Sequence, residues 1–258
     1  MGHARRGHWR RGNDHIEARE RRIAGRCTSA YGCTFMSEPR DIADYAPTPT
    51  QQGMILQALA APDSPINVEQ FVVRVEGGFD SDAFAAAWRK LIERHEALRS
   101  RYSWQVDGSA RCVIQDSAEL AVQIHDAHAW SAAEVDAFIE DDFHTPIDLS
   151  TAPIFRFTCL HLADDEWRLL WCFHHLVMDG RSVVLAINEF FAYYDAFSRG
   201  VEAPALDAPQ PLRRLFEWHA ARDAEADRQF WREYLQGVPN APMLTSIYGQ
   251  APPNGAVA

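Results

Sequence analysis

The sequence predicts an α/β (α+β) fold in which helices pack on a mixed β-sheet. β-branched, apolar segments alternate along the chain with segments whose apolar residues recur every three or four positions, the spacings of strands and helices. The composition, 47% hydrophobic and 24% charged over 258 residues, is that of a globular chain long enough for one large domain or two small ones. The last two predicted strands are separated by the acidic turn Asp164-Asp165-Glu166, which predicts an antiparallel hairpin.

The first half of the chain alternates between helical and strand patterns. A Pro-rich turn leads into a short helix at residues 47–61. Asp80 is a suitable N-cap for a long helix whose apolar positions continue at helical spacing as far as Leu98. Strands are predicted at residues 68–77, 110–116 and 120–126.

The second half contains the predicted hairpin and the longest helices. Ser131 is the expected cap of an amphipathic helix within residues 131–148, and the hairpin strands span 153–162 and 166–175. An Asp-Gly pair then leads into a helix that reaches about Ser198. The remaining segments are a Pro-rich linker at 203–211, a helix at 212–235, and a tail at 237–258 with little periodicity.

Charge is distributed unevenly and argues against nucleic acid as a partner. Residues 1–35 hold eight arginines and three acidic residues, a net charge of +5, so the other residues carry −16 of the total of −11. An acidic body repels phosphate backbones. The basic segment lacks interleaved aromatic residues, so we interpret residues 1–36 as a disordered or spurious extension. No run of about 20 apolar residues and no signal peptide is evident, which predicts a cytoplasmic protein without membrane contact.

The cysteines predict neither disulfides nor a metal site. They are odd in number, scattered and without CxxC spacing, so we interpret them as small buried side chains or spare thiols. They are Cys27, Cys33, Cys112, Cys159 and Cys172.

The segment WCFHHLVMDGRS, residues 171–182, places two histidines at the end of the second hairpin strand. Strand side chains alternate, so His174 and His175 point to opposite faces and cannot share one role. Both faces of this strand are apolar, which predicts that both are covered. A desolvated imidazole at a strand end stays neutral, with one ring nitrogen free to accept a proton. Asp179 is a candidate N-cap, and Gly180 a candidate for an unusual φ.

Other interpretations of the histidine pair remain open. A histidine at a strand end is often a satisfied core residue. Metal binding is disfavoured, because adjacent strand histidines diverge and no third ligand has a familiar spacing. A serine hydrolase requires a GxSxG elbow, which this sequence lacks. A histidine acting directly on a substrate's own nucleophile suits acyl transfer from a thioester to an amine or hydroxyl.

These residues resemble a known family. His174-His175-x-x-x-Asp179-Gly180 resembles the HHxxxDG signature of the condensation-domain superfamily of nonribosomal peptide synthetases, related in fold to chloramphenicol acetyltransferase. RHEALRSRY (94–102) is similar to the family's RHxxLRxxF segment, and PTPTQQGMI (47–55) to its opening segment. ARDAEADRQFWREYLQG (221–237) resembles the helix that closes the N-terminal half. The similarity covers residues 45–237.

The resemblance implies half of a domain. Family members carry two such subdomains with the catalytic histidine at the tunnel between them, so residues 37–237 would be the N-terminal subdomain and 238–258 a truncated linker toward a missing C-terminal subdomain in cis or trans. His175 is then expected at a strand end facing an open side. Heterocyclization domains replace the histidines by aspartate, whereas epimerization domains usually continue DGxSWRxL and this chain continues DGRSVVLAI. Amide-forming condensation is the better match, and epimerization the second.

The resemblance also assigns roles. His175 would be catalytic, acting on the acceptor amine as it attacks the donor thioester, and His174 would be structural. Asp179 would form a buried ion pair with an arginine of the RHEALR segment, with Arg94 preferred over Arg99. Amides following Gly180 would lie near the oxyanion.

Partners and products follow from the same resemblance. No cofactor or metal is bound; the substrates are carried on phosphopantetheine arms of upstream and downstream peptidyl carrier proteins. The biosynthetic product would be a secondary metabolite such as an antibiotic or a siderophore. The chain alone is expected to be inactive. An ester-forming acyltransferase of the same superfamily and a non-catalytic carrier-binding remnant remain alternatives.

Overall fold

The computed structural model describes residues 39–105 and 109–238 of the chain. The chain divides into two compact units, a first unit that ends at Phe216 and a second unit that begins at Glu217. The predicted extension at 1–36 and the tail from residue 239 onward lie outside the described residues. Among the helices that are described, none is long and apolar enough to cross a membrane.

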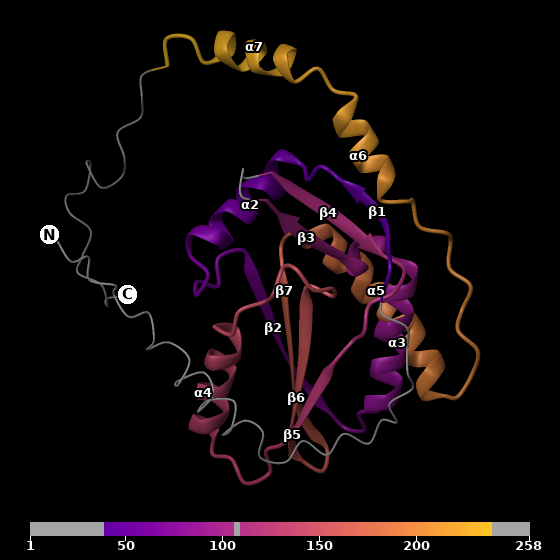
Figure 1. Cartoon of the computed structure of the whole chain (residues 1–258). Coiled ribbons are helices and arrows are strands. Elements are labelled where there is room, and N and C mark those ends of the chain that lie inside the picture. The colour runs from indigo at the N-terminus through magenta and orange to yellow at the C-terminus, as the bar shows by residue number, and fades with distance from the viewer. Residues whose placement is uncertain (1–38, 106–108, 239–258) are drawn as a thin grey trace, which may run out of the picture. The chain divides into compact units, whose positions relative to one another are not determined.

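The helices and strands alternate along the chain as predicted (Figure 1). In chain order they are β1 (Asp41–Tyr45), α2 (Pro49–Ala60), β2 (Val68–Glu76), α3 (Ser81–Arg94), the 3-10 turn η1 (Glu96–Arg99), β3 (Ser100–Trp104), β4 (Ala110–Gln115), β5 (Val122–Asp126), α4 (Ala132–Phe143), β6 (Phe155–Ala163), β7 (Glu166–His174), α5 (Gly180–Ser198), α6 (Arg213–Ala220) and α7 (Ala224–Tyr234).

The strands form two sheets. The larger has four strands in the order β2-β7-β6-β5, with antiparallel pairs except for the parallel pair β5–β6, so it is the mixed sheet that was predicted. β6 and β7 form the predicted hairpin, with Asp164 and Asp165 between them. The smaller sheet, β1-β4-β3, is antiparallel.

Local capping chemistry explains where the helices begin. Asp80 accepts hydrogen bonds from the amides of Asp82 and Ala83 at the start of α3. Ser131 and Glu134 form a capping box at α4, in which each side chain bonds the other residue's amide. Caps of this kind satisfy amides that have no partner within the helix and contribute about 1 kcal/mol each. The predicted caps at Asp80 and Ser131 are therefore confirmed.

Two predicted helices differ from what their apolar spacing indicates: one ends earlier and the other is divided. α3 stops at Arg94, because His95 is extended and η1 and β3 follow. Arg99 closes this end by donating to the carbonyl of Ile92 at 3.0 Å, one of the last-turn carbonyls of α3. The helix predicted at 212–235 is divided into α6 and α7, because Asp223 caps a new helix.

Helices cover both faces of the larger sheet, as the apolar faces of β7 predicted. α3 and α5 lie on one face and α4 on the other (Figure 1). Buried aromatic rings fill the first interface: Phe84, Trp88, Phe157, Trp171 and Phe190. On the other face a single carboxylate, Asp142 of α4, accepts from Gln70, Arg156, Thr158 and Cys172.

Candidate active site

The histidine pair lies where β7 ends and the loop to α5 begins. His174 is the last residue of β7, and only 3% of it is exposed. The side chain of His175 is 30% exposed. The predicted divergence is confirmed, because His174 faces a small pocket whereas the ring of His175 lies edge-on to Phe173, with centroids 5.9 Å apart.

His174 has the surroundings of a structural residue. Its Nδ1 accepts the amide hydrogen of Leu176 at 3.1 Å, so the ring proton lies on Nε2. Nε2 is buried and has no hydrogen-bond partner among the described residues. Burial, and secondarily the neighbouring His175, lower the pKa of His174 to about 4, so this ring is neutral near pH 7. The hydrogen bond between His174 and the Leu176 amide stabilises the turn that follows β7.

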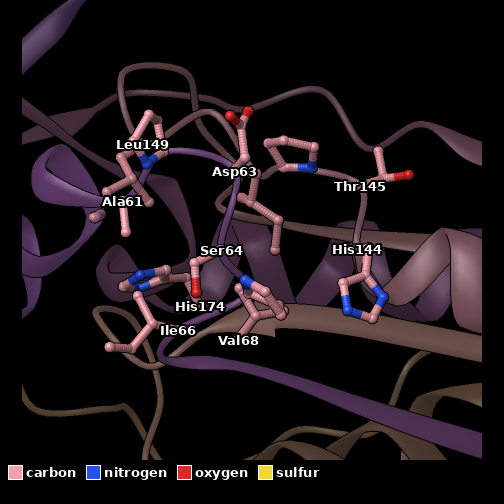
Figure 2. Close-up of a pocket in the computed structure, with 14 residues that line it drawn as sticks. Ala61, Asp63, Ser64, Ile66, Val68, His144, Thr145, Leu149 and His174 are labelled. Carbon is pink, nitrogen blue, oxygen red and sulfur yellow. The ribbon is translucent and has the colours of Figure 1, made fainter. Parts of the chain in front are cut away.

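The pocket beside His174 is too small for a thioester substrate. It lies between the α2–β2 loop and the segment after α4, and its cavity volume is about 40 Å³. Figure 2 shows His174 beside Ser64 at one end and His144 at the other.

The two ring nitrogens of His175 each lie against an acceptor. Nδ1 lies 3.0 Å from the carbonyl oxygen of Met178, and because a carbonyl only accepts, Nδ1 carries a proton. Nε2 lies 3.1 Å from Oε1 of Glu69, whose side chain is 51% exposed. The backbone amide of His175 donates to the carbonyl of Asn67 at 2.8 Å. The ring is thus oriented by backbone at Nδ1, whereas Nε2 contacts a side chain.

Three of the family-like segments meet at one carbonyl in this loop. Tyr102, at the end of RHEALRSRY, donates its hydroxyl to the carbonyl of Leu176 at 2.9 Å. Gln51, from PTPTQQGMI, donates to the Tyr102 hydroxyl at 2.8 Å and to the same carbonyl at 3.2 Å. Tyr102 is buried, which raises its pKa and keeps the hydroxyl protonated as a donor. These contacts fix the loop that carries His175.

Asp179 is the N-cap of α5, and the predicted ion pair with Arg94 or Arg99 is wrong. Ser182 donates to Oδ1 of Asp179 from its amide at 2.8 Å and from its hydroxyl at 2.7 Å. These bonds lower the pKa of Asp179, which is exposed. A carboxylate satisfied by its own helix terminus needs no distant cation.

Gly180 also differs from the sequence-based interpretation. It begins α5 without a positive φ, and a Cβ at this position would meet no atom within 4 Å. The predicted unusual φ is therefore wrong.

The two arginines have other partners. Arg94 bonds Glu189 of α5, with Nε to Oε2 at 3.0 Å, and also donates to the carbonyl of Asp207. His95 lies 2.6 Å from the same carboxylate oxygen. Burial raises the pKa of Glu189, but the bonds from His95 and Arg94 outweigh it, so the net pKa is lowered. Arg99, which is buried, donates to the backbone carbonyls of Ile92, Glu93 and Gln115.

Glu69 and Glu189 were missed by the sequence analysis. Glu69 had a signal, because it occupies the same strand face as Phe71, Val73 and Val75 and is the charged exception in that row. Glu189 had no such signal in the sequence, because a glutamate within a helical pattern is common and does not indicate a partner.

The remaining polar clusters do not assemble a metal centre. Within residues 39–105 and 109–238, no three histidine, cysteine or acidic side chains are placed to hold an ion. Cys112, Cys159 and Cys172 are buried free thiols, as expected, and burial raises the pKa of each to about 11 or 12. Cys27 and Cys33 lie outside the described residues.

Comparison with known proteins decides the family. The sequence model of the Condensation domain matches residues 42–256. The chain belongs to the condensation-domain family of nonribosomal peptide synthetases. Condensation-domain relatives include a linear gramicidin synthase of Brevibacillus parabrevis, 31% identical over 77% of this chain and 4% of that protein. Chondramide synthase cmdD of Chondromyces crocatus is 33% identical over 72% of the chain and 5% of its own length.

Solved condensation domains share the fold. The starter condensation domain of rhizomide synthetase RzmA superposes with a TM-score of 0.67 at 23% identity, covering 77% of this chain and 49% of that one. The first condensation domain of the calcium-dependent antibiotic synthetase, solved with a substrate analogue, gives 0.63 at 18% identity and the same 49%. The chain thus spans about half of each solved condensation domain and a few per cent of the curated synthetases.

Proposed function

We propose that this chain is the N-terminal, histidine-bearing half of an amide-forming condensation domain. The observation that carries the proposal is His175: its Nδ1 bonds the Met178 carbonyl, and its Nε2, in a ring that is 30% exposed, contacts only the half-exposed carboxylate of Glu69 among the described residues. An imidazole held by backbone in this tautomer is a suitable acceptor for an amine proton. The Gln51 and Tyr102 contacts to Leu176 support the proposal by making the loop rigid.

The reaction transfers an acyl group between two carrier-bound substrates. The donor is a thioester and the acceptor an amine, each on the phosphopantetheine arm of a peptidyl carrier protein. The amine nitrogen attacks the thioester carbonyl carbon, and Nε2 of His175 takes the proton that the nitrogen must lose. The C–S bond then breaks, the C–N bond remains, and the departing thiolate receives a proton. Holding the two substrates in line contributes several kcal/mol, and general-base assistance a factor of about 10² to 10⁴.

A complementation assay tests this function. The chain is mixed with a separately expressed C-terminal half of a condensation domain and two loaded carrier proteins, and amide formation is measured by mass spectrometry. We expect product from the parent pair, negligible product from the chain alone, and a rate lowered by about 10² to 10⁴ for His175→Ala with an unchanged melting temperature.

His144→Ala is the matched control for that assay. His144 is half-exposed and lines the small pocket that His174 also lines, so the His144→Ala variant should keep the parent rate. Near-parental amide formation by His175→Ala, or absence of amide from the parent pair, would overturn the proposed function.

A further inference from the structure

Glu69 lies against the ring nitrogen of His175 that is not bonded to the Met178 carbonyl. It lies on β2, an edge strand of the larger sheet, opposite Phe173 of β7. Side chains two residues apart share a strand face, so Glu69 belongs to the face that carries Phe173 and His175. Oε1 of Glu69 lies 3.1 Å from Nε2 of His175, the ring nitrogen that is not bonded to the Met178 carbonyl.

The backbone holds the two side chains together. Asn67 adopts a left-handed conformation, with φ of 61°, that asparagine tolerates better than most residues. Its carbonyl accepts the amide of His175, and its side chain donates to Gln57 of α2 at 2.9 Å. Asn67, just before β2, is therefore held by His175 through its backbone and by α2 through its side chain, and Glu69 follows two residues later.

The contact between Nε2 and Glu69 needs a proton, which comes either from an imidazolium ring or from a cationic donor that binds there. Both neighbours of the His175 ring, the Met178 carbonyl and the Glu69 carboxylate, are acceptors. A ring that can accept a proton from a substrate carries its only proton on Nδ1, and in that state Nε2 and the carboxylate are two acceptors facing each other. A cationic donor between them would bond both. A primary ammonium has three N–H groups and can donate to the carboxylate and to Nε2 at once.

We propose that Glu69 binds the protonated amine of the acceptor and places its nitrogen against Nε2 of His175. This inference rests on the proposed function and names the acceptor class, a primary amine that arrives as an ammonium ion. Glu69 is half-exposed on a flexible side chain, so it can move outward to admit the nitrogen. Nε2 then takes one ammonium proton, which frees the lone pair for attack on the thioester, while Glu69 retains a hydrogen bond from a second N–H. After the attack the nitrogen loses one more proton, which goes to the departing thiolate as the C–S bond breaks.

The kinetic test compares two acceptors in the complemented enzyme. The acceptors are an aminoacyl thioester of N-acetylcysteamine and the corresponding hydroxyacyl thioester, which carries no ammonium. For Glu69→Gln we expect the KM of the amine acceptor to rise about 10-fold, with the KM of the donor and of the hydroxyl acceptor unchanged. Glu76→Gln, at the exposed far end of the same strand, is the control and should match the parent.

A binding test needs no catalysis and separates this inference from the proposed function. The aminoacyl thioester is titrated into the chain alone while the His175 ring is observed by NMR. Its signals should shift in the parent, and the Glu69→Gln variant should need about 10-fold more ligand. An unchanged amine KM, an equal effect on both acceptors, or a ring that does not respond in the parent would overturn the role of Glu69. Loss of amide formation with an intact NMR response would count only against the proposed function.

Discussion

His174 and His175 are adjacent in the chain, yet burial gives them different chemistry. The first is enclosed, accepts a backbone amide and is neutral near pH 7; the second is partly exposed and has one nitrogen free of backbone. A desolvated imidazole loses basicity because its cation is no longer hydrated. This difference is the reason that the proposed function gives the proton transfer to His175 and not to His174.

The depressed pKa of His174 predicts acid sensitivity. Between pH 6.5 and about 4, His174 is protonated in the unfolded chain but neutral in the folded chain. The free energy of unfolding should therefore fall by about 3 kcal/mol as the pH is lowered from 6.5 to about 4. His174→Asn retains an acceptor for the Leu176 amide but does not titrate, so its unfolding free energy should depend less on pH in this range. Urea unfolding at several pH values measures it. His144→Asn should keep the parental slope, and an equally steep slope for His174→Asn would contradict the assignment.

The capping role of Asp179 predicts a modest stability effect. Asp179→Ala should lower the free energy of unfolding by about 1 kcal/mol, the usual cost of losing an N-cap, whereas Asp179→Asn retains an acceptor and should be near neutral. Urea denaturation at pH 7 distinguishes the two variants. A loss of about 3–5 kcal/mol would instead indicate a buried ion pair.

At the scale of elements, a single carboxylate joins the end of α3 to α5. Arg94 and Glu189 are 14% and 22% exposed, and His95 approaches the same oxygen. Because the pair is shielded from water, its charges interact more strongly than they would at the surface. The contact fixes the spacing of the two helices that pack on the aromatic face of the sheet.

A double-mutant cycle measures this link. Arg94→Ala, Glu189→Ala and the double variant should give a coupling energy of about 2 kcal/mol in chemical denaturation. Lys90 and Glu93, an exposed pair on the same helix, provide the matched cycle and should couple by less than about 1 kcal/mol. Equal coupling in the two cycles would show that shielding of Arg94 and Glu189 has no energetic consequence.

At the scale of the whole molecule, the first unit carries an apolar groove on the face shared by β2, α3 and α5. Its cavity volume is about 270 Å³, and its lining includes Phe71, Val73 and Phe191, each at least 40% exposed. Apolar patches of this kind are uncommon on monomeric proteins and mark surfaces that bind other molecules.

The groove predicts binding of an apolar dye. Fluorescence of anilinonaphthalene sulfonate should increase with the folded chain, and Val73→Asp should reduce the increase several-fold by placing a charge in the lining. Val72→Asp is the control, because Val72 is equally exposed but points to the opposite face of the same strand. Equal loss of fluorescence in both variants would show that the dye binds elsewhere.

Local patterns in the sequence determined most of the elements and the family. Strand alternation predicted that β7 is covered on both faces and that the two histidines diverge, because side-chain direction depends only on the backbone repeat. The caps Asp80 and Ser131 were predictable since a cap bonds residues two or three positions away.

Only the tertiary structure decided which distant groups meet. Asp179 and Arg94 looked like partners by resemblance, but the folded chain places Glu189 against Arg94 and Ser182 against Asp179. The contacts of Glu69 with His175 and of Gln51 with the Leu176 carbonyl span 106 and 125 residues. Such pairings depend on how strands and helices pack, which no local spacing encodes, so the partners that orient His175 became visible only in three dimensions.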